Sequence, residues 1–167
     1  MSKLLCIYAN PKSPGESKSL TMAGVFLDVY RRKHPGDTIS EVNAYGDNIP
    51  FIDPDVFSGW GKFQRNEALT GTEQEKVSRI AALTDQFIEA DIYVFVTPMW
   101  NLGLPPMMKA YLDTVVIAGK TFRYTEEGPV GLLSNKRAVH IHARGGVYSK
   151  PPMSEMDFAD RYLILQR

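Results

Sequence analysis

The chain has 167 residues, of which 44% are hydrophobic, and its 19 Lys and Arg residues balance 19 Asp and Glu residues to a net charge of zero. These proportions are typical of one folded domain, and the missing basic excess argues against a protein whose main task is to bind nucleic acid or an anionic membrane. The single cysteine excludes an intrachain disulfide, and no apolar run approaches the roughly 18 residues that span a bilayer, so we expect one cytoplasmic domain over residues 1–167.

The first half of the chain alternates between apolar runs and helical patterns. A continuous apolar run at 4–9 predicts a strand that is buried on both faces. Residues 19–33 carry apolar side chains at helical spacing, and a Pro-Gly pair predicts the end of that helix. The alternating segment 38–43 predicts a second, more exposed strand. A long loop with several aromatic residues is expected at 44–71, and loops of this length are usually functional or pack on a partner.

The second half of the chain continues the same alternation. Thr72 followed by Glu75 fits a capping box, which predicts a helix from this point to residue 88. Residues 92–96 form the clearest buried strand of the chain. The remaining expected elements are a helix at 106–117, a strand at 138–143 and a helix at about 153–163.

This order of elements predicts an α/β fold in which helices cover both faces of a parallel sheet. In such folds, ligands bind outside the carboxyl ends of the strands. The loops that follow the first, third and fourth expected strands, at 10–19, 97–105 and 143–152, are therefore the candidate ligand-binding segments.

The first of these loops combines hydroxyl groups with the start of a helix. Ser17, Lys18 and Ser19 stand where free N–H groups and the positive end of the helix dipole favour a phosphate. The loop has neither the G-x-G-x-x-G dinucleotide fingerprint nor a complete P-loop. In the alternative interpretation, one of the serines only caps the helix.

The other two loops offer apolar side chains and peptide amides. Residues 98–102 read Pro-Met-Trp-Asn-Leu, a set that can line a flat ring or simply pack in the core. Gly145 and Gly146 allow a ligand to approach the backbone, although an ordinary Gly-Gly turn has the same sequence. Three suitable loops at one sheet edge favour a ligand site more strongly than any one of them.

Metal binding and nucleophilic catalysis receive little support from the sequence. His140 and His142 share one face of a strand, but no further ligand is suitably placed by sequence. Cys6 lies inside a buried strand and reads as an inert core thiol. No G-x-S-x-G elbow is present, and we expect no metal site.

At these loops the sequence resembles the FMN-dependent NADH azoreductases, within the flavodoxin-like quinone reductases. Residues 98–102 match the P-[ML]-[YW]-N segment of that family, residues 122–132 match its F-x-Y-T-x-x-G-P-x-G-L segment, and residues 143–146 match its third loop. The similarity extends from residue 1 to about residue 163. The resemblance implies a flavodoxin-like, doubly wound parallel sheet.

The resemblance also implies roles for individual residues. Ser17, Lys18 and Ser19 would hold the FMN phosphate, residues 98–102 would line the isoalloxazine with the Asn101 amide near N5, and the third loop would reach its pyrimidine edge. The implied cofactor-binding residues are Asn10, Ser17, Lys18, Ser19, Pro98, Met99, Trp100, Asn101, Leu102, Ala143, Arg144, Gly145 and Gly146. The implied substrate slot consists of Trp100, Phe122 and Tyr124.

The implied activity is a two-step hydride transfer from NADH or NADPH through FMN to quinones or azo compounds, in a homodimer. Family members continue beyond the fourth helix with a fifth strand and a final helix, so the resemblance implies four of the usual five strands and a C-terminally short domain. Two alternatives are an electron carrier of flavodoxin type and a truncated, non-catalytic family member.

Overall fold

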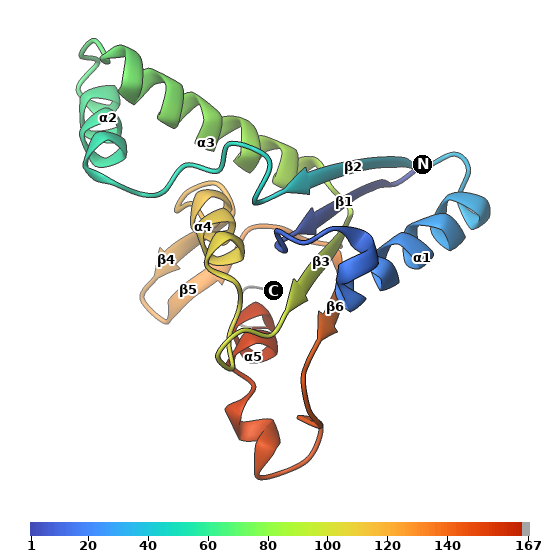
Figure 1. Cartoon of the computed structure of the whole chain (residues 1–167). Helices are drawn as coiled ribbons and strands as arrows, with labels where there is room; N and C mark the ends of the chain where they lie inside the picture. Colours follow the sequence, from blue (N-terminus) through green and yellow to red (C-terminus); the bar gives the residue numbers. More distant parts are fainter. Residues whose placement is uncertain (165–167) are drawn as a thin grey trace. The chain divides into compact units, whose positions relative to one another are not determined.

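The structure is a computed structural model that describes residues 1–164 (Figure 1). Its main sheet has four parallel strands in the order β2-β1-β3-β6, and a separate antiparallel hairpin pairs β4 with β5. The elements in chain order are β1 (Lys3–Tyr8), α1 (Lys18–Lys33), β2 (Thr38–Asn43), α2 (Pro54–Gln64), α3 (Gly71–Glu89), β3 (Ile92–Pro98), α4 (Pro106–Val115), β4 (Phe122–Thr125), β5 (Gly128–Gly131), β6 (Arg137–Ala143) and α5 (Phe158–Ile164), with short 3-10 turns at Pro14–Glu16 and Met153–Met156. The predicted α/β class with a four-stranded parallel sheet is confirmed.

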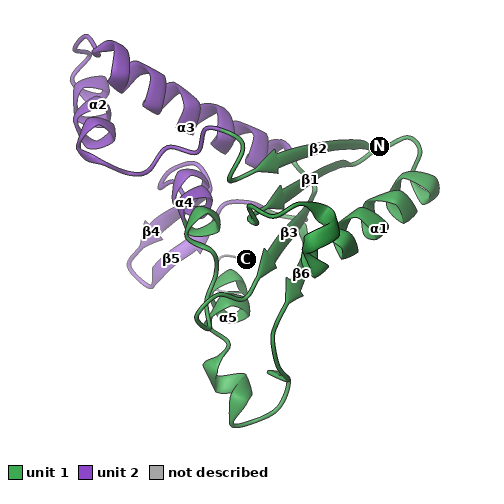
Figure 2. Cartoon of the chain, in the orientation of Figure 1, with its two compact units in different colours: residues 1–47, 90–109, 134–167 green, residues 48–89, 110–133 purple. Residues whose placement is uncertain are grey.

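The chain divides into two compact units, which Figure 2 shows in different colours. The first unit consists of residues 1–47, 90–109 and 134–167, and it contains the four-stranded sheet with α1 and α5. The second unit consists of residues 48–89 and 110–133, and it contains α2, α3 and the β4–β5 hairpin. All three candidate loops belong to the first unit.

Helices lie on both faces of the sheet within the first unit. The strands β1 and β3 are buried along almost their whole length, as their continuous apolar sequences predict. One face of these strands packs on α1 in an apolar cluster that also includes Ile141 of β6. The neighbouring His140 points to the opposite face, where its ring contacts Asp160 of α5. Because side chains alternate along a strand, α1 and α5 cover opposite faces of the sheet.

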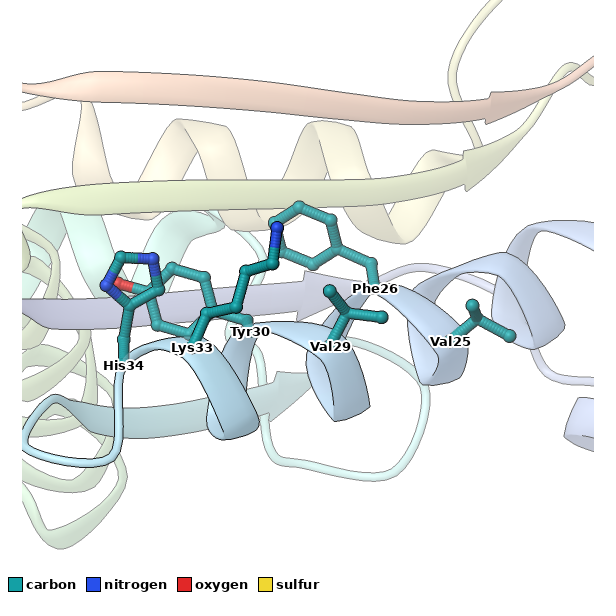
Figure 3. A pocket seen from close by; sticks show the side chains of 6 residues that line it. All are labelled: Val25, Phe26, Val29, Tyr30, Lys33 and His34. Atoms are coloured by element: carbon teal, nitrogen blue, oxygen red, sulfur yellow. The ribbon is translucent and has the colours of Figure 1, made fainter.

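A groove of about 360 Å³ runs along the second half of α1 (Figure 3). Within it, the Tyr30 ring stacks on His34 with 4.5 Å between ring centroids. Its lining residues are Val25, Phe26, Val29, Tyr30, Lys33 and His34. The candidate phosphate loop adjoins the opposite, N-terminal end of α1, so this groove is separate from the predicted ligand site.

The segment 44–71, expected as one long loop, contains the helix α2. Asp53 caps this helix, because its carboxylate accepts a hydrogen bond of 3.1 Å from the Val56 amide. Pro54 occupies the first helical position, where its missing N–H has no cost. The expectation of a continuous loop is therefore wrong, and an Asp-Pro helix-start signal was present in the sequence.

The start of α3 also differs from the expectation, since the capping box uses Thr70 and Glu73 instead of Thr72 and Glu75. The Thr70 hydroxyl accepts a hydrogen bond from the Glu73 amide (3.3 Å), and the Thr70 amide donates to the Glu73 carboxylate (2.8 Å). The reciprocal pattern is the one expected of this motif. The box therefore begins two residues earlier, and α3 starts at Gly71.

Glu73 also connects α3 to α2 within the second unit. Its side chain is buried, and it accepts hydrogen bonds from the Lys62 ammonium (2.8 Å to each oxygen) and the Ser58 hydroxyl (2.7 Å). The bond to Lys62, followed by those to Ser58 and to the Thr70 amide, lowers the pKa of Glu73 to about 2. The carboxylate is thus ionised at any physiological pH and holds the two helices together.

Three smaller differences concern segments later in the chain. The helix predicted at 106–117 ends at Val115. The segment 122–132 contains a short antiparallel hairpin, which the sequence pattern did not predict. The last predicted helix is divided into a 3-10 turn and α5, which begins at Phe158.

Candidate cofactor-binding site

The three candidate loops meet at the carboxyl ends of β1, β3 and β6. The parallel pairing continues just beyond the strand ends, because the Ala9 amide donates to the Val96 carbonyl (3.0 Å) and the Met99 amide donates to the Ala143 carbonyl (2.8 Å). The first contact joins the start of the first loop to β3, and the second joins the second loop to the third. The structure therefore brings the predicted loops together at one sheet edge.

The first loop contains a buried cluster of neutral polar side chains. The Asn10 side-chain amide donates to the Ser17 hydroxyl (2.7 Å), which lies 3.1 Å from the Ser19 hydroxyl. All three residues are buried, whereas Lys18 is exposed. Ser17 also caps α1, because its hydroxyl accepts a bond of 3.3 Å from the Leu20 amide. The prediction that a serine caps the helix is thus confirmed, and the same serine also belongs to the polar cluster.

This cluster has the chemistry that a phosphate requires. It lies at the N-terminus of a helix of 16 residues whose first turn contains no acidic side chain, so the positive end of the helix dipole is not compensated there. The hydroxyl groups of Ser17 and Ser19 are donors suited to phosphate oxygens, and Lys18 adds a positive charge next to them. The residues present fit the phosphate of FMN.

The second loop contains a tight turn in an uncommon backbone conformation. The backbone groups of Trp100 and Gly103 bond to each other in both directions, at 3.1 and 2.9 Å. The two residues between them have positive φ angles, 46° for Asn101 and 66° for Leu102. Such residues cost on the order of 1 kcal/mol each when they are not glycine, and they concentrate at functional sites. Trp100 is the first residue of this turn and is 36% exposed, so part of its side chain is accessible.

The third loop presents its backbone to open space. A Cβ atom added to Gly145 would meet no atom within 4 Å, and one added to Gly146 would meet only Tyr148 at 3.4 Å. The peptide groups of this loop are therefore accessible to a ligand, as the pyrimidine edge of a flavin requires. The Arg144 guanidinium, in contrast, is already engaged, because its Nη1 donates to Asp157 Oδ2 at 2.7 Å.

Two stacked histidines lie on β6, directly before the third loop. The rings of His140 and His142 are 4.5 Å apart with 17° between their planes. His140 bonds to the Thr97 hydroxyl (2.8 Å) and to Asp160 (3.1 Å), whereas the Nε2 atom of His142 is buried without a partner among residues 1–164. Burial lowers the pKa of both rings and, together with the neighbouring His140, brings that of His142 to about 4. Both rings are therefore neutral at physiological pH.

The remaining candidates for chemistry are inert in the structure. Burial raises the pKa of the Cys6 thiol to about 12, so this core thiol stays protonated. Within the described part of the chain, no group of three or more His, Cys, Asp or Glu side chains is arranged to hold a metal ion. No helix among residues 1–164 is long and apolar enough to cross a membrane.

Two residues that the sequence did not single out contact the candidate loops. The Phe158 amide donates to the Leu102 carbonyl (3.0 Å), and Asp157 accepts the bond from Arg144. Asp157 also caps the start of α5, because its Oδ1 accepts a bond of 3.1 Å from the Asp160 amide. An aspartate three residues before an amide of a helical first turn is an N-cap signal, and this signal could have located Asp157.

The residues predicted to form a substrate slot belong to different units. Trp100 lies in the first unit, whereas Phe122 and Tyr124 lie on β4 in the second. The rings of Phe122 and Tyr124 contact each other edge to face, with 5.2 Å between centroids, and Tyr124 is well exposed. Their part in a substrate slot remains a prediction.

The parallel sheet and its three loops define a flavodoxin-like protein, and comparison with known proteins agrees. The family model described as "Flavodoxin-like fold" matches residues 2–165. An FMN-dependent NADH:quinone oxidoreductase of Staphylococcus haemolyticus is 48% identical over 163 residues, and FMN-dependent NADH:quinone oxidoreductase 2 of Bacillus subtilis is 51% identical over 166 residues. These alignments cover 98% of this chain and 78% and 79% of the two relatives.

Solved structures lead to the same family. A crystal structure of an FMN-dependent NADH-azoreductase from Bacillus anthracis in complex with FMN matches with a TM-score of 0.93 and 36% identity, over 98% of this chain and 79% of that one. The chain therefore belongs to the family of FMN-dependent NADH:quinone oxidoreductases. The resemblance that the loop motifs indicated is confirmed.

Proposed function

We propose that the protein is an FMN-dependent oxidoreductase that uses NADH to reduce quinones and azo compounds. The names of its relatives support this activity. One observation within the chain carries the proposal. A buried hydroxyl and amide cluster at a helix start and two loops with accessible peptide groups meet at one sheet edge. The first feature fits a phosphate and the second fits a polar ring, which are the two ends of FMN.

Each end of the cofactor is assigned to specific residues. Asn10, Ser17 and Ser19, with the charge of Lys18, hold the phosphate. Residues 98–102 line the ring, and the peptide groups of Gly145 and Gly146 donate to the carbonyl oxygens of its pyrimidine edge. Peptide N–H groups aimed at this edge favour negative charge there, which assists reduction.

The bound FMN supplies the hydride chemistry, in one half-reaction with the nicotinamide and a second with the acceptor. The protein contributes binding and orientation, and no side chain is assigned as an acid or base at the reacting position. The neutral state of His140 and His142 is consistent with this, because neither ring is in the imidazolium form that acts as a strong acid at neutral pH. Trp100 offers an exposed aromatic surface on which flat acceptors can stack.

We further propose that the enzyme is a cytoplasmic homodimer. The helix α2 exposes aromatic side chains, with Phe57 64% and Phe63 71% accessible, and the Phe57 ring contacts Trp60 edge to face. Exposed aromatic groups gathered on one helix are typical of a protein interface. Replacing Phe57 and Phe63 by serine is expected to yield a monomer in sedimentation experiments, and an unchanged mass would exclude this surface as the interface.

The decisive experiment is a visible spectrum of the purified protein, supplied with FMN, before and after anaerobic addition of NADH. We expect bound flavin absorbance that NADH bleaches and that a quinone restores. Bound flavin that NADH does not bleach would instead indicate an electron carrier. A well-folded protein that remains colourless after exposure to excess FMN would overturn the proposal.

A further inference from the structure

The two loops proposed to face the flavin ring are joined to each other and to α5 in a closed circuit of contacts. The Met99 amide bonds to the Ala143 carbonyl, which joins the second loop to the third. Arg144, the next residue of the third loop, bonds to Asp157. The amide of the following residue, Phe158, returns to the Leu102 carbonyl in the second loop. The residues at the start of α5 therefore connect the two loops and complete the circuit.

Among the contacts of this circuit, the bond between Asp157 and Arg144 is the one made by side chains. Asp157 is 4% exposed, and its two carboxylate oxygens have separate tasks, since Oδ1 accepts from the Asp160 amide and Oδ2 from Arg144. Burial tends to raise its pKa, but the Asp160 amide and the Arg144 guanidinium outweigh this effect and hold the pKa below its ordinary value. The pair is thus charged on both sides at neutral pH.

Arg144 in turn spans the base of the third loop. Its guanidinium lies 6.0 Å from the centre of the ring of Tyr148, four residues later in the loop, while it bonds to Asp157. The resemblance assigns Arg144 to the cofactor, and in the structure its Nη1 atom already donates to Asp157. The bond to Asp157 fixes the position of this guanidinium, so its loss leaves the Arg144 side chain without that restraint.

We propose that Asp157 is a positioning residue that acts through Arg144 and the Phe158 amide to hold both ring-facing loops in the geometry that binds FMN. The proposal rests on the proposed function. Arg144 then serves the cofactor through its contact with Asp157 and through its backbone, while its guanidinium remains in the pair. Because each member neutralises the other, the pair as a whole adds little net charge beside the ring.

The test uses four variants of the full chain. Asp157→Asn keeps the shape of the side chain and its ability to accept from the Asp160 amide, but it removes the charge that holds Arg144. Arg144→Met removes the other partner, and the double variant removes both. Asp160→Asn is the matched control, because Asp160 lies three residues further on, in α5, and its carboxylate contacts His140 instead of Arg144.

The first readout requires no cofactor. Hydrogen–deuterium exchange in the FMN-free protein is expected to accelerate at 98–104 and 143–150 in D157N and R144M, and to match wild type in D160N. Unchanged exchange in both loops would overturn the inference, even if the protein proves not to bind FMN. Should D157N fail to fold, R144M tests the same contact from its more exposed side.

The second readout is the dissociation constant of FMN, measured by flavin fluorescence. D157N and R144M should each weaken binding about tenfold, which corresponds to the loss of one charge-assisted hydrogen bond. The double variant should be no weaker than either single variant, since the two residues act as one unit. Additive losses, or an equal loss in D160N, would contradict the inference.

The third readout is the reduction potential of the bound flavin, which a purely structural role would not move in opposite directions. D157N leaves an uncompensated positive charge and should raise the potential, because reduced flavin carries negative charge. R144M leaves a negative charge and should lower the potential, and the double variant should return close to wild type. Shifts of the same sign in both single variants would contradict the neutral pair that the inference places beside the ring.

Discussion

The two ends of the proposed FMN site are built in different ways. The phosphate end uses buried side chains from one contiguous stretch, Asn10, Ser17 and Ser19, and one of these also caps α1. The ring end uses accessible backbone from two loops that lie about 45 residues apart in the chain and are supported by α5. At the phosphate end, binding and folding depend on the same groups. At the ring end, binding and folding depend on different groups. Substitutions at the ring end should therefore change FMN binding alone, whereas those at the phosphate end should change binding and stability together.

The largest expected effect is at the ring end. Gly145→Val should leave the melting temperature unchanged, because its Cβ meets no protein atom within 4 Å. It should nevertheless weaken FMN binding about 30- to 100-fold, since the branched side chain fills space that the ring requires, at a cost of about 2–3 kcal/mol. Flavin fluorescence titration measures FMN binding and thermal unfolding measures stability, so the two effects can be told apart. Gly24→Val, at an equally open position on α1, is the control, and wild-type flavin content in G145V would count against this placement.

At the phosphate end, Ser17→Ala should lower binding and stability together. The loss of the cap is expected to cost about 1 kcal/mol of unfolding free energy. The loss of a phosphate donor should weaken FMN binding about tenfold. Chemical denaturation without FMN and titration with FMN provide the two values. Ser134→Ala, at an exposed serine outside the three loops, should change neither, and a stable S17A protein with weak binding would remove the contrast between the two ends.

Acid should loosen the ring end before the phosphate end. The folded-state pKa of His142 is about 4, whereas the unfolded ring titrates near 6.5, so the unfolded state binds more protons between these values and stability falls as pH decreases from 6.5 to 4. The charged and titratable groups around the ring are His140, Arg144, Asp157 and Asp160. The loss should be on the order of 2 kcal/mol across this range.

The cluster of Asn10, Ser17 and Ser19 at the phosphate end contains only neutral side chains, so this change of pH should not affect it. Hydrogen exchange in the FMN-free protein, compared at pH 5 and pH 7.5, reports the local stability of both ends. After correction for the chemical effect of pH on exchange, we expect faster exchange at pH 5 in residues 143–150 and no difference in residues 10–19. His142→Gln should flatten the dependence of stability on pH. The prediction fails if that variant keeps the slope of the wild-type protein.

The smallest expected effect concerns the backbone of the second loop. Asn101 has φ of 46°, which glycine adopts freely and alanine does not. Asn101→Ala should therefore cost about 1 kcal/mol and a few-fold in FMN binding, whereas Asn101→Gly should remain within about threefold of wild type. Equal binding losses in the two variants would show that the side-chain amide, instead of the turn, contacts the cofactor.

Much of the fold could be predicted because its signals are local. The continuous apolar runs of β1 and β3 identify central strands, and the rule for parallel sheets then places the loops at one edge. The phosphate cluster was found for the same reason, since Ser17 and Ser19 stand at a helix start. The capping box of α3 was displaced because two Thr-x-x-Glu patterns overlap there, Thr70 with Glu73 and Thr72 with Glu75.

The features that were not predicted depend on contacts between elements. Asp157 matters through Arg144, 13 residues earlier, and only the position of α5 brings the two together. The hairpin of β4 and β5 has strands of four residues each, which is too short for a reliable alternating pattern. The helix α2 was obscured by its two glycines, Gly59 and Gly61, which are unfavourable inside a helix.

The carboxylate of Glu73 has a consequence for the order in which the chain acquires structure. Its partners Ser58, Lys62 and Thr70 lie within 15 residues of it, and contacts of such short range form quickly. The pairing of β1 with β3, in contrast, must wait until β3 has been synthesised, since Leu4 pairs with Ile92. During synthesis, the α2–α3 hairpin can therefore close as soon as it leaves the ribosome, and it is ready as a prefolded segment when the later strands arrive.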